Sequence, residues 1–139
     1  MAWLRPCLLL LALWLVGCDR GAAPAAPALP ADGRIQWQGL LACADCDGIQ
    51  TGLVLVRSGE LRNYTLTETY LARDGGARFV EGGHWQRDRE LLRLRGDAGG
   101  IRVFALLPDG RLQPRDGHGR EFRPRQGDFL APVTTRDAP

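Results

Sequence analysis

The stretch Leu61-Arg-Asn-Tyr-Thr-Leu-Thr-Glu-Thr-Tyr-Leu-Ala-Arg73 alternates between two kinds of side chain. Successive residues of a strand point to opposite faces of a sheet, so Tyr64, Leu66, Glu68 and Tyr70 share one face. Asparagine and threonine side chains occupy the other face. The pattern predicts a strand with one mainly apolar and one polar face.

Short apolar or alternating runs of the same kind continue on both sides of this stretch. Glycine and aspartate lie between the runs and supply the positive φ angles that tight turns need. From residue 35 onward no run has the spacing of an amphipathic helix. The sequence therefore predicts an all-β fold, an up-and-down antiparallel meander that closes into a small barrel or a highly curved sheet. The eight expected strands are Ile35–Leu41, Ile49–Arg57, Leu61–Arg73, Ala77–Arg87, Glu90–Arg95, Ile101–Leu107, Arg111–Arg115 and Arg120–Pro124.

Aromatic residues gather on the face that we expect to line the barrel interior. Phe79 and Trp85 share a face by the same period, and with Tyr64 and Tyr70 they would surround the interior. The rings either fill it as a core or border a cavity for one small ligand. An inward-facing Glu68 needs a partner such as an arginine, because an unpaired buried carboxylate is costly, and it would mark a ligand contact. A β-bulge would instead turn it outward.

The segment Gly39-Leu-Leu-Ala-Cys43-Ala-Asp-Cys46-Asp-Gly-Ile49 contains the cysteines with chemical potential. Their spacing brings two sulfurs within reach. In an oxidising compartment they form a disulfide, and when reduced they would suit Cu(I) as a soft metal. A structural zinc site needs four ligands, so two cysteines fit zinc less well than Cu(I). A thioredoxin-like motif would precede a helix, and the sequence predicts no helix here. The flanking Asp45 and Asp47 disfavour thiolates and argue against a catalytic cysteine. A structural disulfide is the first expectation and metal binding the second.

The N-terminus has the features of an export signal. Arg5 precedes the apolar run Leu8–Val16, which is too short to span a bilayer and suits a signal peptide. It ends in Leu15-Val-Gly-Cys18, which resembles a bacterial lipobox. The resemblance implies that Cys18 receives a diacylglyceryl group, that cleavage precedes it, and that its freed amine is acylated, for example with palmitate. Several acyl chains together anchor a protein stably.

We therefore expect a bacterial envelope protein that is lipid-anchored and faces the periplasm, with the lipid bilayer as a partner. Asp19 after the lipidated cysteine leaves the choice between outer and inner membrane open. The expected divisions are a signal peptide at 1–17, the lipidated cysteine and a flexible Pro/Ala tether at 18–33, a barrel domain at 34–125 and a tail at 126–139. Within the tail, Phe129-Leu130 is expected to add a final apolar contact.

Composition excludes several classes of function. The chain has 139 residues, a length that favours one domain. Its formal net charge of +2 does not suggest the concentrated basic face of a nucleic-acid-binding protein. It has no lysine, so Schiff-base chemistry is excluded. Ser58 is the single serine, and the two histidines, His84 and His118, are far apart. We therefore expect no enzymatic activity.

The residues 39–55 around the cysteine pair resemble the signature of the NlpE-type copper-resistance lipoproteins. Residues 64–71 and 79–85 are similar to two later strands of that family, so the likeness runs in order over about 37–107. One departure is Ala42, which stands where the family usually has proline.

The resemblance implies a small lipocalin-like barrel of the N-terminal NlpE type. It implies a role in copper homeostasis, adhesion or surface sensing, and reporting of envelope stress to an inner-membrane sensor kinase. Cu(I) held by Cys43 and Cys46 would be its cofactor. Larger members carry a second, OB-like domain for which this sequence ends too early. The alternative function is a lipocalin-like carrier of a small ligand with a purely structural Cys43–Cys46 disulfide.

Overall fold

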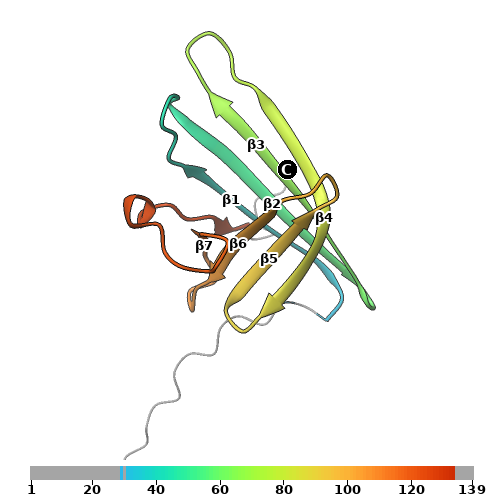
Figure 1. Ribbon diagram of the computed structural model, residues 1–139. Coiled ribbons are helices and arrows are strands. Elements are labelled where there is room, and N and C mark those ends of the chain that lie inside the picture. Colours follow the sequence, from blue (N-terminus) through green and yellow to red (C-terminus); the bar gives the residue numbers. More distant parts are fainter. Residues whose placement is uncertain (1–28, 30, 134–139) are drawn as a thin grey trace, which may run out of the picture.

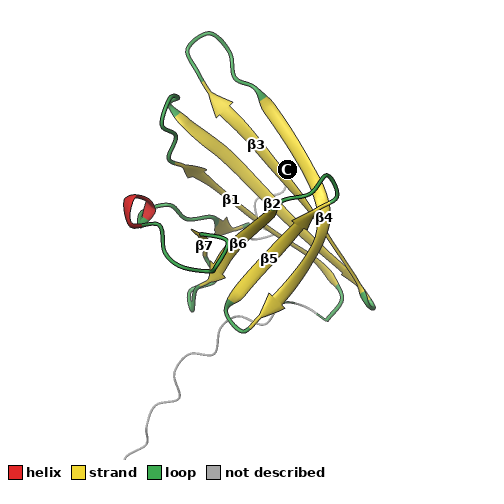
Figure 2. Cartoon of the chain, in the orientation of Figure 1, coloured by secondary structure: helices red, strands yellow, loops and turns green. Residues whose placement is uncertain are grey.

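The computed structural model describes Leu29 and residues 31–133, which form one antiparallel sheet curved into a nearly closed barrel (Figure 1). The expected signal peptide, Cys18, Asp19 and most of the tether lie outside the described residues. The strand order is β7-β6-β5-β4-β3-β2-β1-β8, so chain neighbours are sheet neighbours except at β8 (Figure 2). The elements are β1 (Gly33–Leu41), β2 (Gly48–Ser58), β3 (Leu61–Leu71), β4 (Arg78–Asp88), β5 (Leu91–Gly96), β6 (Ile101–Leu106), β7 (Leu112–Arg115), the 3-10 turn η1 (Arg123–Arg125) and β8 (Ala131–Pro132). Within the described part of the chain, no helix has the length and apolar character to cross a membrane.

The all-β meander is confirmed, and the ends of its first seven strands differ from the expected ones by at most two residues. The eighth expected strand, Arg120–Pro124, is wrong. The Asp116 side chain accepts hydrogen bonds from the amides of His118 and Arg120, which favours a local turn. Proline has no N–H to donate to a ladder, and Pro124 lies in η1.

The C-terminal segment closes the barrel. Leu112 of β7 and Leu130 exchange two backbone hydrogen bonds of 2.9 and 2.8 Å, and β8 then pairs with β1. Leu130 is fully buried in the core. The segment can approach because residue 39 is glycine, since a Cβ there would lie 2.2 Å from the Phe129 carbonyl oxygen. Residues 130–132, which were expected to lie in a tail, thus pair with strands of the barrel.

The core lies inside the barrel and consists of alternating residues of the long strands β1 to β4 together with residues of β5, β6, β7 and the closing segment. Two buried tryptophans satisfy their indole N–H groups: Trp37 donates to the Gly110 carbonyl oxygen at 2.8 Å and Trp85 to that of Val56 at 3.2 Å. Burial of each large apolar side chain stabilises the fold by about 1.5–3 kcal/mol. The cluster consists of Trp37, Leu41, Ile49, Leu53, Leu55, Tyr64, Leu66, Trp85, Leu92, Leu94, Phe104, Leu106, Leu112 and Leu130.

The barrel wall has two heights. Strands β1 to β4 have 9 to 11 residues, whereas β5 to β7 have 4 to 6. β4 pairs with β3 from Arg78 onward but with β5 only from Gly83 onward. The inner face of the long strands therefore continues beyond the short ones and leaves one end of the barrel open (Figure 1).

Candidate functional site

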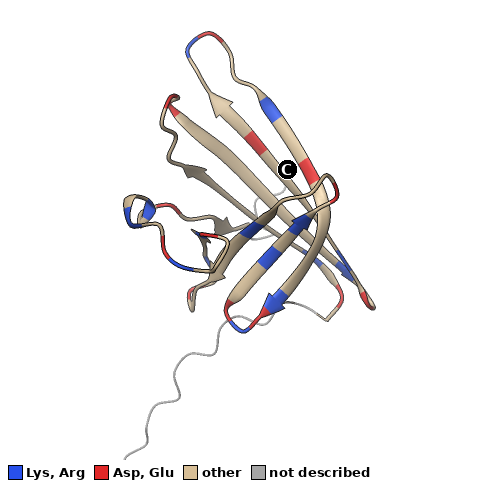
Figure 3. Ribbon diagram, in the orientation of Figure 1, with Lys and Arg blue, Asp and Glu red and all other residues tan. Residues whose placement is uncertain are grey.

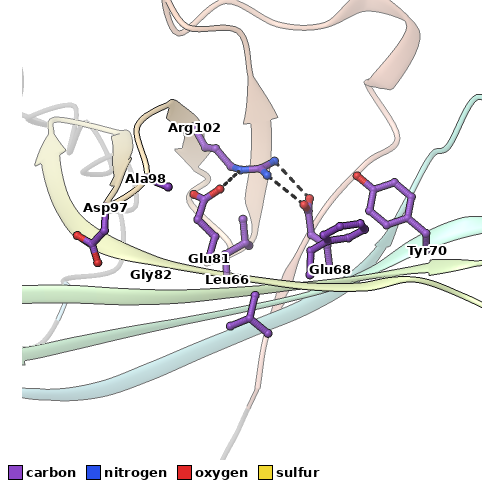
Figure 4. Close-up of a pocket in the computed structure, with 10 residues that line it drawn as sticks. Leu66, Glu68, Tyr70, Glu81, Gly82, Asp97, Ala98 and Arg102 are labelled. Atoms are coloured by element: carbon purple, nitrogen blue, oxygen red, sulfur yellow. Dashed lines mark hydrogen bonds and ion pairs between the residues drawn. The ribbon is translucent and has the colours of Figure 1, made fainter.

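Two cavities lie at the open end, on either side of one ion pair. Their volumes are about 490 and 500 Å³, and both are lined by Glu68, Tyr70 and Arg102. The first adjoins β4 and the turn between β5 and β6, and Figure 4 shows its lining side chains. The second extends towards Pro114 of β7 and towards Asp116, Phe122 and Arg125 in the connection between β7 and β8.

The five aromatic and acidic residues predicted to line a cavity divide between core and open end. Tyr64 and Trp85 are buried in the core, as the core interpretation expects. Glu68, Tyr70 and Phe79 line the first cavity, where the Tyr70 and Phe79 rings meet edge to face at 5.5 Å. The structure corrects the expectation of an interior Phe79, whose side chain is 58% exposed. Its face of β4 is the inner one, but β5 ends too early to cover it.

An ionic network crosses the open end. Glu68 faces inward and is buried, and its carboxylate accepts hydrogen bonds from both terminal nitrogens of Arg102 at 3.0 and 3.3 Å (Figure 4). Arg102 Nε also donates to Glu81 Oε2 at 3.3 Å. The other Glu81 oxygen accepts the Tyr64 hydroxyl at 2.5 Å. Burial, reinforced by Glu81 as acceptor, raises the pKa of Tyr64 well above its usual value, so its hydroxyl remains a donor.

The first cavity has an excess of negative charge. Glu68, Glu81 and Asp97 line it together with one cation, Arg102. Figure 3 shows acidic residues on β3 and β4 near the open end. A neutral Tyr64 does not offset this charge. The geometry therefore favours cationic or hydrogen-bond-donating groups in this cavity.

The cysteine loop lies at the same end of the barrel, between β1 and β2. Cys43 and Cys46 form a disulfide with a Cα–Cα distance of 5.3 Å, and both half-buried side chains pack against the core. Asp45 and Asp47 are exposed. The Asp47 amide donates to the Leu71 carbonyl oxygen at 2.9 Å and so attaches the loop to β3.

A second attachment comes from residues that the sequence analysis did not single out. The buried Asp128 carboxylate accepts the Ala42 amide at 3.2 Å and pairs with Arg125 at 3.4 Å. Arg125 also donates to the Ala42 carbonyl oxygen at 2.7 Å. The spacing of Arg125 and Asp128 in the sequence indicates only a local ion pair. It could not reveal their shared contact with Ala42, which lies more than 80 positions earlier in the chain. The loop is thus held by the segment that closes the barrel.

The donor set of the loop fits Cu(I) only after reduction. A disulfide sulfur carries no negative charge, whereas copper binding by cysteine requires thiolates. Within the described range, no group of three or more His, Cys, Asp or Glu side chains is placed to hold a metal ion. Two-electron reduction of the disulfide would give two neighbouring thiols, and their thiolates are a donor set that Cu(I) accepts.

Comparisons with known proteins agree with this geometry. Residues 37–123 match the NlpE N-terminal domain. The chain is 35% identical over 121 residues to lipoprotein NlpE of Escherichia coli K12, covering 83% of this chain and 48% of that protein. It superposes on the crystal structure of the Cpx pathway activator NlpE from Escherichia coli with a TM-score of 0.57 and 29% identity, covering 77% of this chain and 53% of that one. The chain spans about half the length of these relatives. It belongs to the NlpE N-terminal domain family.

Proposed function

We propose that this protein is a lipid-anchored, periplasm-facing lipoprotein that reports envelope stress to a sensor kinase in the inner membrane. The observation that carries the proposal is the family match, which spans both the cysteine loop and the strands around the open end. The curated relative is a lipoprotein, and the solved relative is an activator of the Cpx pathway. The lipobox-like Leu15–Cys18 supplies the attachment point for the acyl chains.

The geometry supports action by docking. The cysteine loop and the cavities occupy one end of the barrel, and a disulfide and the Asp128 contacts hold the loop in place. A surface that is ordered before binding loses less conformational entropy when a partner arrives. The open end is therefore the part of the molecule best suited to contact a sensor.

The experiment is expression of the full chain in Escherichia coli that lacks its own NlpE and carries a Cpx-dependent reporter. The proposal expects reporter induction together with recovery of the protein in the membrane fraction. The matched control is Cys18→Ser, which removes the acylated thiol while leaving the described residues unchanged. Equal reporter activity with the full chain and with an empty vector, at detectable protein levels, would contradict the proposal.

The second candidate function is copper handling by the reduced cysteine pair. It is supported by the adjacency of two half-buried sulfurs in a loop that the fold holds in place. Reduced Cys43 and Cys46 would bind one Cu(I) as two thiolates. In the oxidised form the same pair serves as a staple of the loop.

This candidate is tested by a thiol count on the protein from the periplasmic side, with and without reductant, followed by Cu(I) titration of the reduced form. One tightly held copper, lost in Cys43→Ser with Cys46→Ser, would support it. Equal copper affinity of the double variant and the wild type would exclude the pair as the binding site. The control Ser58→Ala changes an exposed turn residue on β2 and leaves both cysteines in place.

A further inference from the structure

β4 has an unpaired edge at the open end of the barrel. The β4–β5 ladder begins at Gly83, and the last backbone contact on that side is the Asp97 amide on the Gly82 carbonyl oxygen at 2.9 Å. The Tyr70 amide donates to Ala77, so in the alternating antiparallel ladder the odd-numbered residues of β4 bond to β3. The backbone groups of Arg78 and Val80 therefore point away from β3. Among the described residues no strand pairs with them.

The acidic cavity lies along this edge. Its walls include Val80 and Gly82 of β4 on one side and Asp97 and Ala98 of the β5–β6 turn on the other. Asp97 follows directly on Gly96, the last residue of β5, so the cavity borders the edge of β4 that lies beyond the end of β5. A segment lying there would extend the sheet and direct alternate side chains into the cavity.

The charge of the cavity selects the kind of side chain. Glu68 and Glu81 share the single guanidinium of Arg102. Asp97 is exposed and has no ion-pair partner in the described part of the chain. The rings of Tyr70 and Phe79 border the same space and attract cations through their faces.

The second cavity has a different charge. It shares Glu68 and Arg102 with the first but adds Arg115, Asp116 and Arg125. Its cations outnumber its carboxylates. The preference for a cation therefore belongs to the side of the open end that adjoins β4.

We propose that the β4 edge and the acidic cavity form a docking site for an extended protein segment that carries a lysine or arginine side chain. The backbone of the segment pairs with Arg78 and Val80, and its cationic group enters the cavity towards Asp97 and Glu81. The inference rests on the proposed function, since it names the chemistry of the protein partner that the open end would receive.

The test measures binding of a fluorescent synthetic peptide to the full chain in detergent by anisotropy. The peptide alternates valine and threonine around one central lysine, and matched peptides carry glutamate or norleucine in its place. The proposal expects the lysine peptide to bind at least about fivefold more tightly than the norleucine peptide and the glutamate peptide to bind most weakly. Equal affinities for the three peptides would overturn it.

Two variants separate backbone pairing from side-chain contacts. Val80→Pro removes an N–H that points away from β3, so the barrel keeps its own hydrogen bonds while the added strand loses one. Val80→Thr keeps that N–H. The proposal expects loss of peptide binding in the first variant and retention in the second, with unchanged circular dichroism in both. Binding retained by a folded Val80→Pro would overturn strand addition.

The cavity charge is tested by Asp97→Asn, with Glu60→Gln in the exposed β2–β3 turn as a control of equal net charge. Asp97→Asn is expected to weaken lysine-peptide binding about fivefold, and Glu60→Gln to leave it unchanged. Equal effects would show a general charge effect and overturn the site. The Cpx reporter separates the two proposals. If the wild type induces the reporter and Asp97→Asn and Val80→Pro induce it equally well, the docking site is contradicted while the proposed signalling function stands.

Discussion

Arg102 of β6 forms a two-point ion pair with Glu68 of β3, with the Nη2–Oε2 distance at 3.0 Å and the Nη1–Oε1 distance at 3.3 Å. The pair joins the short wall of the barrel to the long one, because β6 and β3 are separated in the sheet by β5 and β4. It also explains how a carboxylate occupies the apolar stripe of β3, since the guanidinium satisfies both of its oxygens.

Arg102→Met should lower the free energy of unfolding by about 2 kcal/mol, because it leaves the buried Glu68 carboxylate without its partner. The estimate lies below the range for fully buried pairs since 42% of the Arg102 side chain is exposed. Urea denaturation at neutral pH provides the measurement. The control Arg120→Met removes a largely exposed arginine paired with Asp116 and should cost less. Equal losses in both variants would contradict the structural role of the pair.

Gly39→Ala should destabilise the protein by about 2 kcal/mol or more, since its Cβ would overlap the Phe129 carbonyl oxygen. The Leu112–Leu130 pairing that closes the barrel would then be displaced. Gly52→Ala in β2 is the matched control, because no atom lies within 4 Å of a Cβ there. Thermal unfolding should separate the two variants clearly. A Gly39→Ala protein as stable as Gly52→Ala would show that the close approach does not exist.

Tyr64 should remain protonated in the folded protein at a pH where an ordinary tyrosine ionises, because burial and the Glu81 acceptor raise its pKa. The folded state favours the neutral form, so this group stabilises the fold fully below about pH 10 and ceases to do so as the pH rises further. In Tyr70→Phe the sole tyrosine is Tyr64. Its tyrosinate absorbance should rise only together with alkaline unfolding, and a rise centred at pH 10 in the folded protein would contradict the network.

Asp128→Asn should loosen the cysteine loop, because the group that accepts the Ala42 amide and pairs with Arg125 loses its negative charge. We expect faster hydrogen exchange of the Ala42 amide, faster reduction of the disulfide by dithiothreitol, and a stability loss of about 1–2 kcal/mol. Asp45→Asn, which changes an exposed carboxylate of the loop itself, is the control. If the Ala42 amide exchanges as slowly in Asp128→Asn as in the wild type, the Asp128 carboxylate does not hold the loop.

The strands could be predicted from the sequence because their determinants are local. The alternation in Leu61–Leu71 and the turn glycines identify strand ends to within two residues. β8 has two residues and no periodicity, and its pairing with β1 depends on the close approach at Gly39. The inner face of Phe79 follows from the period of two, but its exposure depends on where a different strand ends.

The site was predictable in its parts and not in its arrangement. The sequence indicates the Cys43–Cys46 pair and the need of Glu68 for a cation, because spacing and burial cost are properties of one segment. Arg102, which pairs with Glu68, lies 34 positions further along the chain. Asp128, which holds the cysteine loop through the Ala42 amide, lies 86 positions beyond Ala42. An arginine-rich chain offers many equivalent candidates, so only the register of the sheet selects among them.

Signalling by the lipid-anchored protein is measured as Cpx-reporter activity in Escherichia coli lacking its own NlpE, with the full chain and Cys18→Ser compared at equal cellular levels. We expect a several-fold induction by the full chain, its recovery as an acylated membrane protein, and a clear loss of induction in Cys18→Ser. Reporter activity at the empty-vector level, with an acylated chain present in the membrane, would show that this lipoprotein does not report envelope stress to the Cpx sensor.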